Sequence, residues 1–144
     1  MRGVLLVLLA GCTSPGDPGA GGPDGRCESD DQCGGDVCAR NGVCLPASEI
    51  RPIHVTWTLQ GMPASQTTCA SSPDLEIDFY TPTGGYGGYG GYIGFAPVPC
   101  EEGAFSIDKL PTSFTVVQLG QQRYNGEAAM LDAATGSAAI DLPF

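Results

Sequence analysis

Basic side chains and histidine are scarce in this sequence, and their scarcity excludes several kinds of function. The 144 residues include one histidine, six lysines and arginines together, and sixteen acidic residues, which gives a formal net charge of −10. A chain with this charge is repelled by the phosphates of nucleic acids and by anionic lipid headgroups. We therefore predict no nucleic-acid partner, and we interpret the acidity as a source of solubility rather than as a cation-binding function.

Motifs for catalysis are also missing. The sequence contains no G-x-S-x-G nucleophile elbow, no phosphate-binding loop and no dinucleotide-binding fingerprint. The single histidine, His54, has no His-x-x-x-His or carboxylate partner that would indicate a metal, so a surface histidine is the better interpretation. Glu101 and Glu102 are neighbours in an expected turn and would point apart. We predict no catalytic residue, no metal site and no cofactor, and therefore a protein that is not an enzyme.

Long apolar runs are absent, and one short run stands at the start of the chain. Val4 to Leu9 is far shorter than a membrane-spanning helix, which needs about 20 apolar residues. The run follows Met1-Arg2 and precedes small residues, which is the order of the parts of an export signal. Residues 1–11 are therefore predicted to be a signal peptide.

The four residues Leu9-Ala10-Gly11-Cys12 resemble the lipobox at which bacterial lipoproteins are cleaved and lipidated. The resemblance implies that Cys12 becomes the first mature residue, with a diacylglyceryl group on its sulfur and an acyl chain on its amine. Each buried CH₂ contributes about 0.8 kcal/mol, so three chains form a lasting membrane anchor. Thr13 stands where an inner-membrane retention signal would have Asp. If the source is a Gram-negative cell, the resemblance therefore implies the outer membrane, at either its surface or its periplasmic face. The alternative is an ordinary secretory signal with an incidental cysteine.

Seven cysteines make an odd number until one of them is assigned to lipid. With Cys12 lipidated, six remain for three disulfides, which suits an oxidising compartment. Four of the six are clustered and two stand apart, which divides the chain. We predict a flexible Gly/Pro-rich tether at residues 12–26, a four-cysteine disulfide module at 27–46 and a β domain at 50–144. The six disulfide cysteines are Cys27, Cys33, Cys38, Cys44, Cys69 and Cys100.

The four-cysteine module has too few apolar residues to fold by hydrophobic burial, so its bridges must define it. It has C-x5-C-x4-C-x5-C spacing, with Ser-Asp before the second cysteine and Asn-Gly-Val-Cys at the end. This pattern resembles small modules of bacterial surface lipoproteins and the N-terminal cysteine-rich region of Dickkopf proteins. Four cysteines allow three connectivities, and the interleaved habit of such modules implies Cys27–Cys38 and Cys33–Cys44.

Zinc is disfavoured because there is no C-x2-C pair and no nearby histidine. The acidic residues of the module do not fit a calcium-binding loop and are interpreted as a solvated turn; they are Glu28, Asp30, Asp31 and Asp36.

Residues 50–144 show the period-two alternation of β-strands with one buried face. Apolar residues alternate with polar ones from Ile53 to Leu59 and again from Leu75 to Phe79, which places Asp78 on an outer, polar face. Further strands are predicted at residues 92–96, 104–107, 113–119 and 137–142. The sequence EAAMLDAA at 127–134, followed by Thr-Gly, predicts one short helix. Strands punctuated by Pro and Gly in this way predict a mainly β fold with a single antiparallel β-sandwich.

Two known sandwich types are candidates for this domain. Residues 103–107, followed by 110–116, resemble the strand, Leu-Pro turn and aromatic strand of carboxypeptidase-regulatory-like, transthyretin-type domains, although Ser113 stands where these have Gly. The resemblance implies a non-catalytic module. An Ig-like sandwich is the alternative, but Trp57 precedes both cysteines, unlike the Cys, Trp, Cys order of antibody domains. A Cys69–Cys100 bridge would close a loop of about thirty residues and stabilise the domain by about 3–4 kcal/mol.

The run at residues 84–94 consists of three tandem Gly-Gly-Tyr units followed by Ile-Gly. Because glycine pairs give a freely flexible backbone, the run is predicted to be a surface loop between strands. Tyr86, Tyr89 and Tyr92 would then offer flat aromatic area with a polar tip to a glycan or a protein. The alternative is a loop without function, or tyrosines that lie back on the sheet.

The sequence thus predicts a lipid-anchored cell-envelope protein that presents a β domain for ligand binding, protein binding or adhesion. Its expected partners are the membrane, through Cys12, and a glycan or protein ligand. A structural or assembly subunit of an outer-membrane or periplasmic complex is the alternative, which the small size of the chain and the lack of a pocket-forming motif support. A third hypothesis is a protease inhibitor that acts through the cysteine module.

Overall fold

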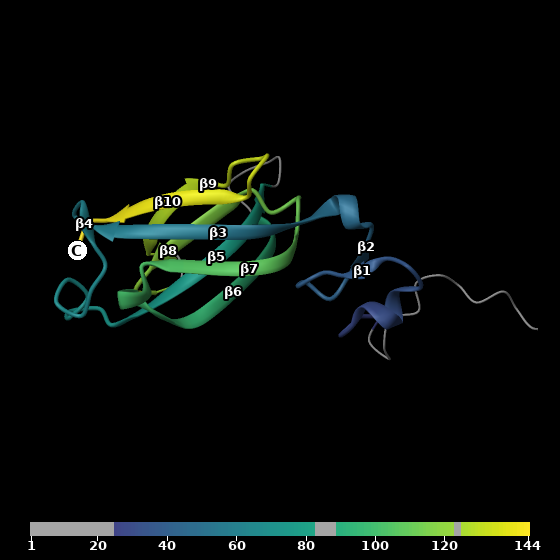
Figure 1. Cartoon of the computed structure of the whole chain (residues 1–144), viewed down its shortest axis with the longest axis horizontal. Helices are drawn as coiled ribbons and strands as arrows, with labels where there is room; N and C mark the ends of the chain where they lie inside the picture. The colour runs from purple at the N-terminus through teal and green to yellow at the C-terminus, as the bar shows by residue number, and fades with distance from the viewer. Residues whose placement is uncertain (1–24, 83–88, 123–124) are drawn as a thin grey trace, which may run out of the picture.

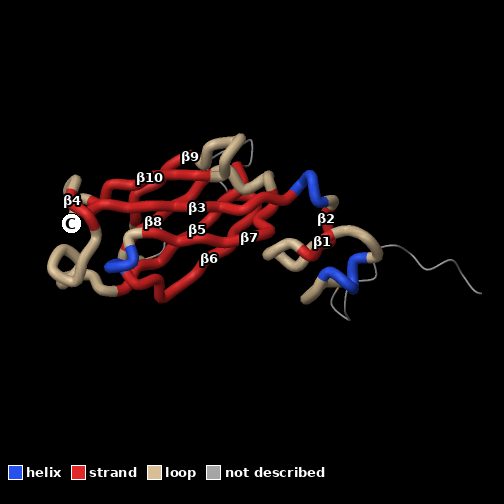
Figure 2. Tube along the Cα trace, viewed as in Figure 1, coloured by secondary structure: helices blue, strands red, loops and turns tan. Residues whose placement is uncertain are grey.

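The computed structural model describes residues 25–82, 89–122 and 125–144. Figure 1 shows a small part with β1 and β2 beside a larger β domain that holds the other strands. Within the described ranges, helix is limited to short 3₁₀ segments (Figure 2), and none of them is long and apolar enough to cross a membrane. The predicted signal peptide, Cys12 and most of the predicted tether lie outside the described residues.

The small part is the predicted four-cysteine module. It consists of a 3₁₀ helix and a short antiparallel pair of strands, namely η1 (Asp30–Cys33), β1 (Val37–Cys38) and β2 (Cys44–Leu45). Disulfides join Cys27 to Cys38 and Cys33 to Cys44, with Cα separations of 5.7 and 5.4 Å. This is the interleaved pairing that the resemblance implied. Three of the four cysteines are buried against one another, so the bridges themselves form the core of the module.

One sheet of the β domain is built around β3 (Ile50–Leu59). β10 (Ser137–Leu142) pairs along one edge of β3, whereas β4 (Met62–Pro63) and β7 (Ala104–Pro111) pair with the other edge. The β10–β3 pair is parallel, which departs from the antiparallel arrangement that the sequence predicted. The parallel direction is possible because the chain enters β10 from β9 of the other sheet, rather than through a hairpin with β3.

The other sheet has four strands in the order β6, β5, β8, β9, and all of its pairs are antiparallel. In chain order these strands are β5 (Asp74–Pro82), β6 (Tyr89–Pro99), β8 (Val116–Gly120) and β9 (Gly126–Met130). Two further 3₁₀ segments precede β3 and follow β6, namely η2 (Ala47–Glu49) and η3 (Cys100–Glu102). β6 and β9 are therefore the edge strands of this sheet.

The two sheets share one hydrophobic core. The predicted alternation is confirmed, because its apolar members on β3 and β5 are buried: Ile53, Val55, Trp57, Leu59, Leu75, Ile77 and Phe79. The indole Nε1 of Trp57 donates a hydrogen bond of 2.8 Å to the carbonyl of Cys100. Cys100 forms the third disulfide with Cys69, and both cysteines are buried in the same core. The fold is mainly β, as predicted.

The predicted helix at residues 127–134 is wrong. The segment forms β9 instead, and all five residues of β9 pair with β8. Helix propensities differ among ordinary residues by at most about 0.7 kcal/mol each. The backbone pairing of all five β9 residues with β8 outweighs this preference for a helix. The turn that follows is held by Asp132, whose Oδ1 accepts hydrogen bonds from the N–H groups of Ala134 and Thr135 at 3.0 and 2.8 Å.

Candidate functional site

The cysteine module contacts the β domain at a β-bulge in β7. Between its pairs with β3 at Ile107 and Leu110, β7 places two residues, Asp108 and Lys109, opposite the single Pro52. Proline has no N–H to give to a ladder, so an irregular register costs little at this point. Lys109 takes a left-handed backbone conformation, with φ of 54°. A bulge of this kind re-aims side chains, and both bulged residues contact the module.

Two ion pairs and a backbone hydrogen bond join the module to this bulge. Lys109 Nζ donates to the two carboxylate oxygens of Asp30 at 2.9 and 2.8 Å. Arg40 Nε donates to Asp108 Oδ1 at 3.0 Å, and its guanidinium forms an ion pair with the same carboxylate. The Arg40 N–H donates to the Lys109 carbonyl at 3.0 Å. Each exposed ion pair contributes about 1 kcal/mol or less. No single contact is therefore enough to hold the module against the β domain, and the three contacts act jointly.

The two cations of these contacts favour the ionised form of the carboxyl groups that they touch. The hydrogen bonds of Lys109 lower the pKa of Asp30, and the N–H of Cys38, at 3.0 Å, lowers it further. The hydrogen bond of Arg40 lowers the pKa of Asp108 in the same way. Both carboxyl groups are exposed. Both carboxyl groups are therefore ionised at neutral pH, and the ion pairs weaken as the pH falls through their lowered pKa values.

The docked module forms one wall of a groove beside β6. The groove has a volume of about 920 Å³, within the range of ligand sites in proteins. Arg26 and module residues 27–30, 32 and 38–43 line one side, and residues 91–94 of β6 line the other, together with Lys109 and Phe114. Because most of the lining belongs to the module, the groove depends on the contacts between the module and β7.

Half of the predicted Gly-Gly-Tyr loop is a strand, which corrects the prediction for this run. β6 begins at Tyr89, and its first residues pair with β5, with Tyr92 opposite Tyr80. Cross-strand side-chain contacts outweigh the flexibility of glycine here. Tyr86 and the side chain of Tyr89 lie outside the described residues. Tyr92 is thus the one candidate tyrosine whose side chain the structure describes.

Tyr92 lies back on the sheet and still lines the groove. Its ring centroid lies 5.6 Å from that of Tyr80. Gly94 makes room for it, because a Cβ at position 94 would clash with the Tyr92 hydroxyl and lie 2.6 Å from Asp78 Oδ1. Nevertheless, 37% of Tyr92 remains exposed, and the residue lines the groove. The groove therefore contains an aromatic ring that is both packed and accessible.

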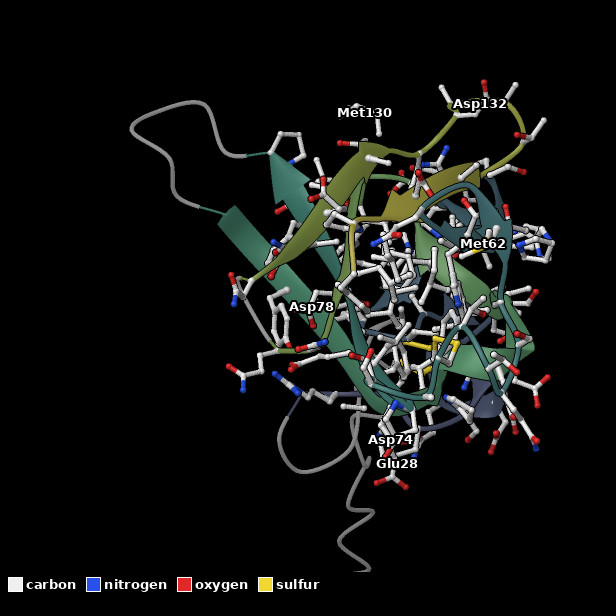
Figure 3. The ribbon with its side chains drawn as sticks, turned by 90° about the vertical axis from the view of Figure 1, so that its left-hand side faces the viewer. Glu28, Met62, Asp74, Asp78, Met130 and Asp132 are labelled. Carbon is white, nitrogen blue, oxygen red and sulfur yellow. A yellow bond between two sulfur atoms is a disulfide. The ribbon has the colours of Figure 1, made fainter. Side chains whose placement is uncertain are left out.

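A buried carboxylate lies next to this ring. Asp78, labelled in Figure 3, is 2% exposed and Tyr80 is 1% exposed. Both positions lie on the face of β5 opposite the buried Ile77 and Phe79, because side chains alternate along a strand. The Tyr80 hydroxyl lies 3.3 Å from both Asp78 Oδ2 and Gln118 Oε1, and it donates its one hydrogen to one of them at a time.

The expectation of a solvent-facing Asp78 is therefore wrong. Tyr80 and Tyr92 occupy the same face beside it, so a position that alternation alone assigns to the surface lies among aromatic side chains and is buried. The signal that was present in the sequence is a tyrosine two positions after the aspartate, since residues i and i+2 of a strand share a face.

The predicted surface histidine is exposed and hydrogen-bonded. His54 on β3 lies opposite Ser106 on β7, and its Nδ1 is 2.8 Å from the serine hydroxyl. A second hollow, of about 630 Å³, lies at this pair and includes the rings of Phe95 and Phe105, whose centroids are 5.2 Å apart. In the described part of the chain no hydrogen bond orients the other ring nitrogen of His54. Among the described residues, the pair therefore has no third group of the kind that orients the base of a nucleophilic triad.

Three cysteine sulfurs of the module lie as close together as metal ligands. The sulfurs of Cys27, Cys33 and Cys38 lie within 4.8 Å of one another. All three belong to disulfides, and the thiolate, not the disulfide, is the metal ligand. Two adjacent bridges explain their proximity.

Comparison with known proteins gives no relative for this fold or this groove. No protein-family model, curated protein or solved structure matches the chain.

Proposed function

We propose that this chain is a lipid-anchored protein of the bacterial cell envelope, held in the outer membrane through Cys12. The export signal and the lipobox Leu9-Ala10-Gly11-Cys12 support this proposal. The other six cysteines support it too, because they form three disulfides. Such bridges persist in oxidising compartments outside the cytoplasm, and Cys12 is the cysteine that remains for lipid.

The anchored chain presents a non-catalytic β domain that binds a glycan or a protein in the groove between the cysteine module and β6. The observation that carries this proposal is Tyr92, whose ring packs against Tyr80 while 37% of the residue stays exposed in the groove. A flat aromatic ring with a polar tip suits the surfaces of both sugars and peptides. We assign the two sheets to a sandwich of the transthyretin or Ig-like type, which their common core supports.

Metabolic labelling tests the anchor. Cells grown with an alkyne-bearing palmitate should yield labelled wild-type protein and an unlabelled Cys12→Ser variant, because only the thiol of the lipobox accepts the diacylglyceryl group. Thr13→Ser is the matched control and should stay labelled. Equal labelling of the Cys12→Ser protein would contradict the anchor.

Retention of envelope components tests the groove. Full-length protein in detergent is immobilised and exposed to solubilised envelope from the same cells. Tyr92→Ser should lower retention about fivefold, which corresponds to the loss of an aromatic contact of about 1 kcal/mol. Met62→Ser is the control, because Met62 is exposed on β4 at the end of the β domain away from the module (Figure 1). Unchanged retention by Tyr92→Ser would contradict binding in the groove. Equimolar retention of one envelope protein through another surface would favour the assembly-subunit alternative.

A further inference from the structure

β6 is an edge strand, and the middle of it lacks the usual protection of an edge. In the described part of the chain it pairs only with β5. Edge strands are normally kept from pairing with other chains by charged residues, proline or bulges. Residues 89–99 contain no charged side chain, and both prolines follow residue 96. The register shifts lie on either side of residues 92–95, which leaves that stretch as a regular, uncharged edge.

The other edges of the β domain carry such protection. β9 contains Glu127 and β10 contains Asp141. β4 is two residues long and ends in Pro63. β7 has a bulge in its pairing with β3, contains Asp108 and Lys109, and is contacted by the module through the Lys109 carbonyl. β6 is therefore the edge of this domain that is best suited to accept another strand.

The unprotected stretch faces the groove with its backbone. Three residues of the stretch, 92–94, line the groove together with Gly91, and Phe95 continues the edge beyond it towards the second hollow. Side chains of consecutive strand residues point to opposite faces, so a groove lined by four residues in succession runs along the edge of the strand and not along one face. The N–H and C=O groups of that edge are the groups that pair with a neighbouring strand. On the other side, the module limits the space beside this edge.

The groove also collects positive charge on an acidic chain. Three of the six basic residues in the sequence line it, namely Arg26, Arg40 and Lys109. Two of them are neutralised by the ion pairs to Asp108 and Asp30 described above. Arg26 has no carboxylate partner among the described residues and is exposed. It is the cation of the groove that is free to meet an acidic group.

Arg26 is held at this position by its neighbours. The N–H of Cys27 donates to the Gly42 carbonyl at 2.9 Å. Gly42, with φ of 79°, lies under the Arg26 stem, since a Cβ there would lie 3.3 Å from the Arg26 Cβ. Glu28 also lines the groove, so the charge at this end is mixed, and a bound carboxylate is favoured at Arg26 and disfavoured at Glu28.

We propose that the groove receives an extended segment of a partner protein, which adds as a strand along residues 92–95 of β6 and places an acidic side chain beside Arg26. The proposal rests on the function proposed above and names the partner class for the same groove. Main-chain hydrogen bonds give the affinity of such an added strand, and alternate side chains give its selectivity. Four strand residues span about 13 Å, so a short linear segment is sufficient.

A peptide selection supplies the probes for this proposal. A displayed library of random twelve-residue peptides is selected on the full-length protein in detergent, and fluorescence polarisation measures the affinities of the synthetic peptides. The selected sequences should be enriched in acidic residues. N-methylation then distinguishes strand addition from other binding, because only one edge of an added strand pairs with β6. Methylation of alternate residues in one register should weaken binding about tenfold or more, whereas methylation in the other register should change it less than about twofold.

Charge variants test the position of the acidic side chain. Arg26→Gln should weaken peptide binding about fivefold, as the loss of an exposed ion pair of about 1 kcal/mol predicts. Met62→Glu changes the net charge by the same amount at the far end of the β domain and should leave binding unchanged. Glu28→Gln should strengthen binding, because it removes a like charge from the groove.

The outcomes separate this proposal from the function on which it rests. Equal losses from both methylation registers, or an unchanged affinity of Arg26→Gln, would overturn the added strand with its acidic contact. If the library yields no binder while Tyr92→Ser still loses an envelope glycan, the partner class is wrong and the proposed function stands. If Tyr92→Ser retains every envelope component, both are overturned.

Discussion

The cysteine module and the β domain reach a fixed structure by different means. The module has a core of buried cysteines and two disulfides, whereas the β domain has a hydrophobic core shared by two sheets and one disulfide. A segment as short as residues 27–46 cannot bury enough apolar surface to offset its lost conformational entropy, so covalent links are needed. The groove lies between these two regions, and its two walls therefore depend on different interactions.

Removal of one disulfide of the module should produce the largest difference in stability between the two regions. In a Cys33→Ala, Cys44→Ala double variant, we expect residues 27–46 to lose their fold, because little else forms a core there. The free energy of unfolding of the β domain should change by about 1 kcal/mol or less, since exposed ion pairs join the two regions. Hydrogen exchange measured by mass spectrometry should show lost protection in 27–46 only. Persistent protection of the module would show that the bridge does not define its fold.

Truncation of a side chain in the hydrophobic core should instead destabilise the β domain. Phe79 is fully buried and its ring packs edge-on against Phe95, with centroids 6.3 Å apart. Phe79→Ala should lower the free energy of unfolding of the β domain by about 3–5 kcal/mol. Urea unfolding followed by the fluorescence of the single tryptophan, Trp57, measures this loss. Val43→Ala, in the exposed part of the module, is the control and should leave the transition in place. A loss near 1 kcal/mol would contradict the shared core.

A methyl group at position 94 should show how tightly the β6 wall of the groove is packed. Gly94→Ala should destabilise the β domain by about 1–3 kcal/mol, because the new Cβ forces the Tyr92 side chain off the strand. In a Tyr92→Ser background the same change should cost less, since the clash with the ring is gone. A double-mutant cycle of urea midpoints measures the difference. Equal costs in both backgrounds would mean that the ring does not lie over position 94.

Acid should separate the two regions while each stays folded, and this is the smallest of the expected effects. The pKa values of Asp30 and Asp108 are lowered below the usual value of about 3.9, because Lys109 and Arg40 bind their charged forms. A lowered pKa means that the contact is complete above about pH 4 and is lost as the pH falls through the lowered values.

Hydrogen exchange of the Arg40 amide measures this separation, since that N–H donates to the Lys109 carbonyl. After correction for intrinsic exchange rates, its protection should fall between pH 6 and pH 2. A variant with Asp30→Asn and Asp108→Asn should already show the low protection at pH 6. Equal protection of wild type and variant at pH 6 would mean that the ion pairs do not hold the module.

Strands with a clear alternation of apolar and polar residues could be predicted from the sequence, whereas strands set by their partners could not. On β3 and β5 the alternation of apolar and polar residues is a property of each segment alone, so both strands were predicted. β9 is rich in alanine and the start of β6 is rich in glycine, and neither composition favours a strand. Both segments become strands because the backbones of β8 and β5 form hydrogen bonds with them. The parallel β10–β3 pair likewise depends on long-range topology.

The candidate site shows the same division. Tyr92 was a candidate because the Gly-Gly-Tyr repeat is visible in the sequence. The groove was not predicted, because it depends on Asp30 with Lys109 and Arg40 with Asp108, pairs that are 79 and 68 residues apart. Single charges at such separations carry no local pattern. The bulge opposite Pro52, which brings both pairs to one place, has no signal in periodicity either.

The parallel pair of β3 and β10 has a mechanical consequence. The two strands are in register from Ser137 beside His54 to Leu142 beside Leu59. β3 starts next to the module, and β10 ends at the opposite end of the β domain (Figure 1). A pull between these two ends slides the strands along each other, so the hydrogen bonds of the whole pair carry the load together instead of opening one after another. In a chain anchored as we propose, a pull on the C-terminal end of β10 would therefore load the β3–β10 pair in shear.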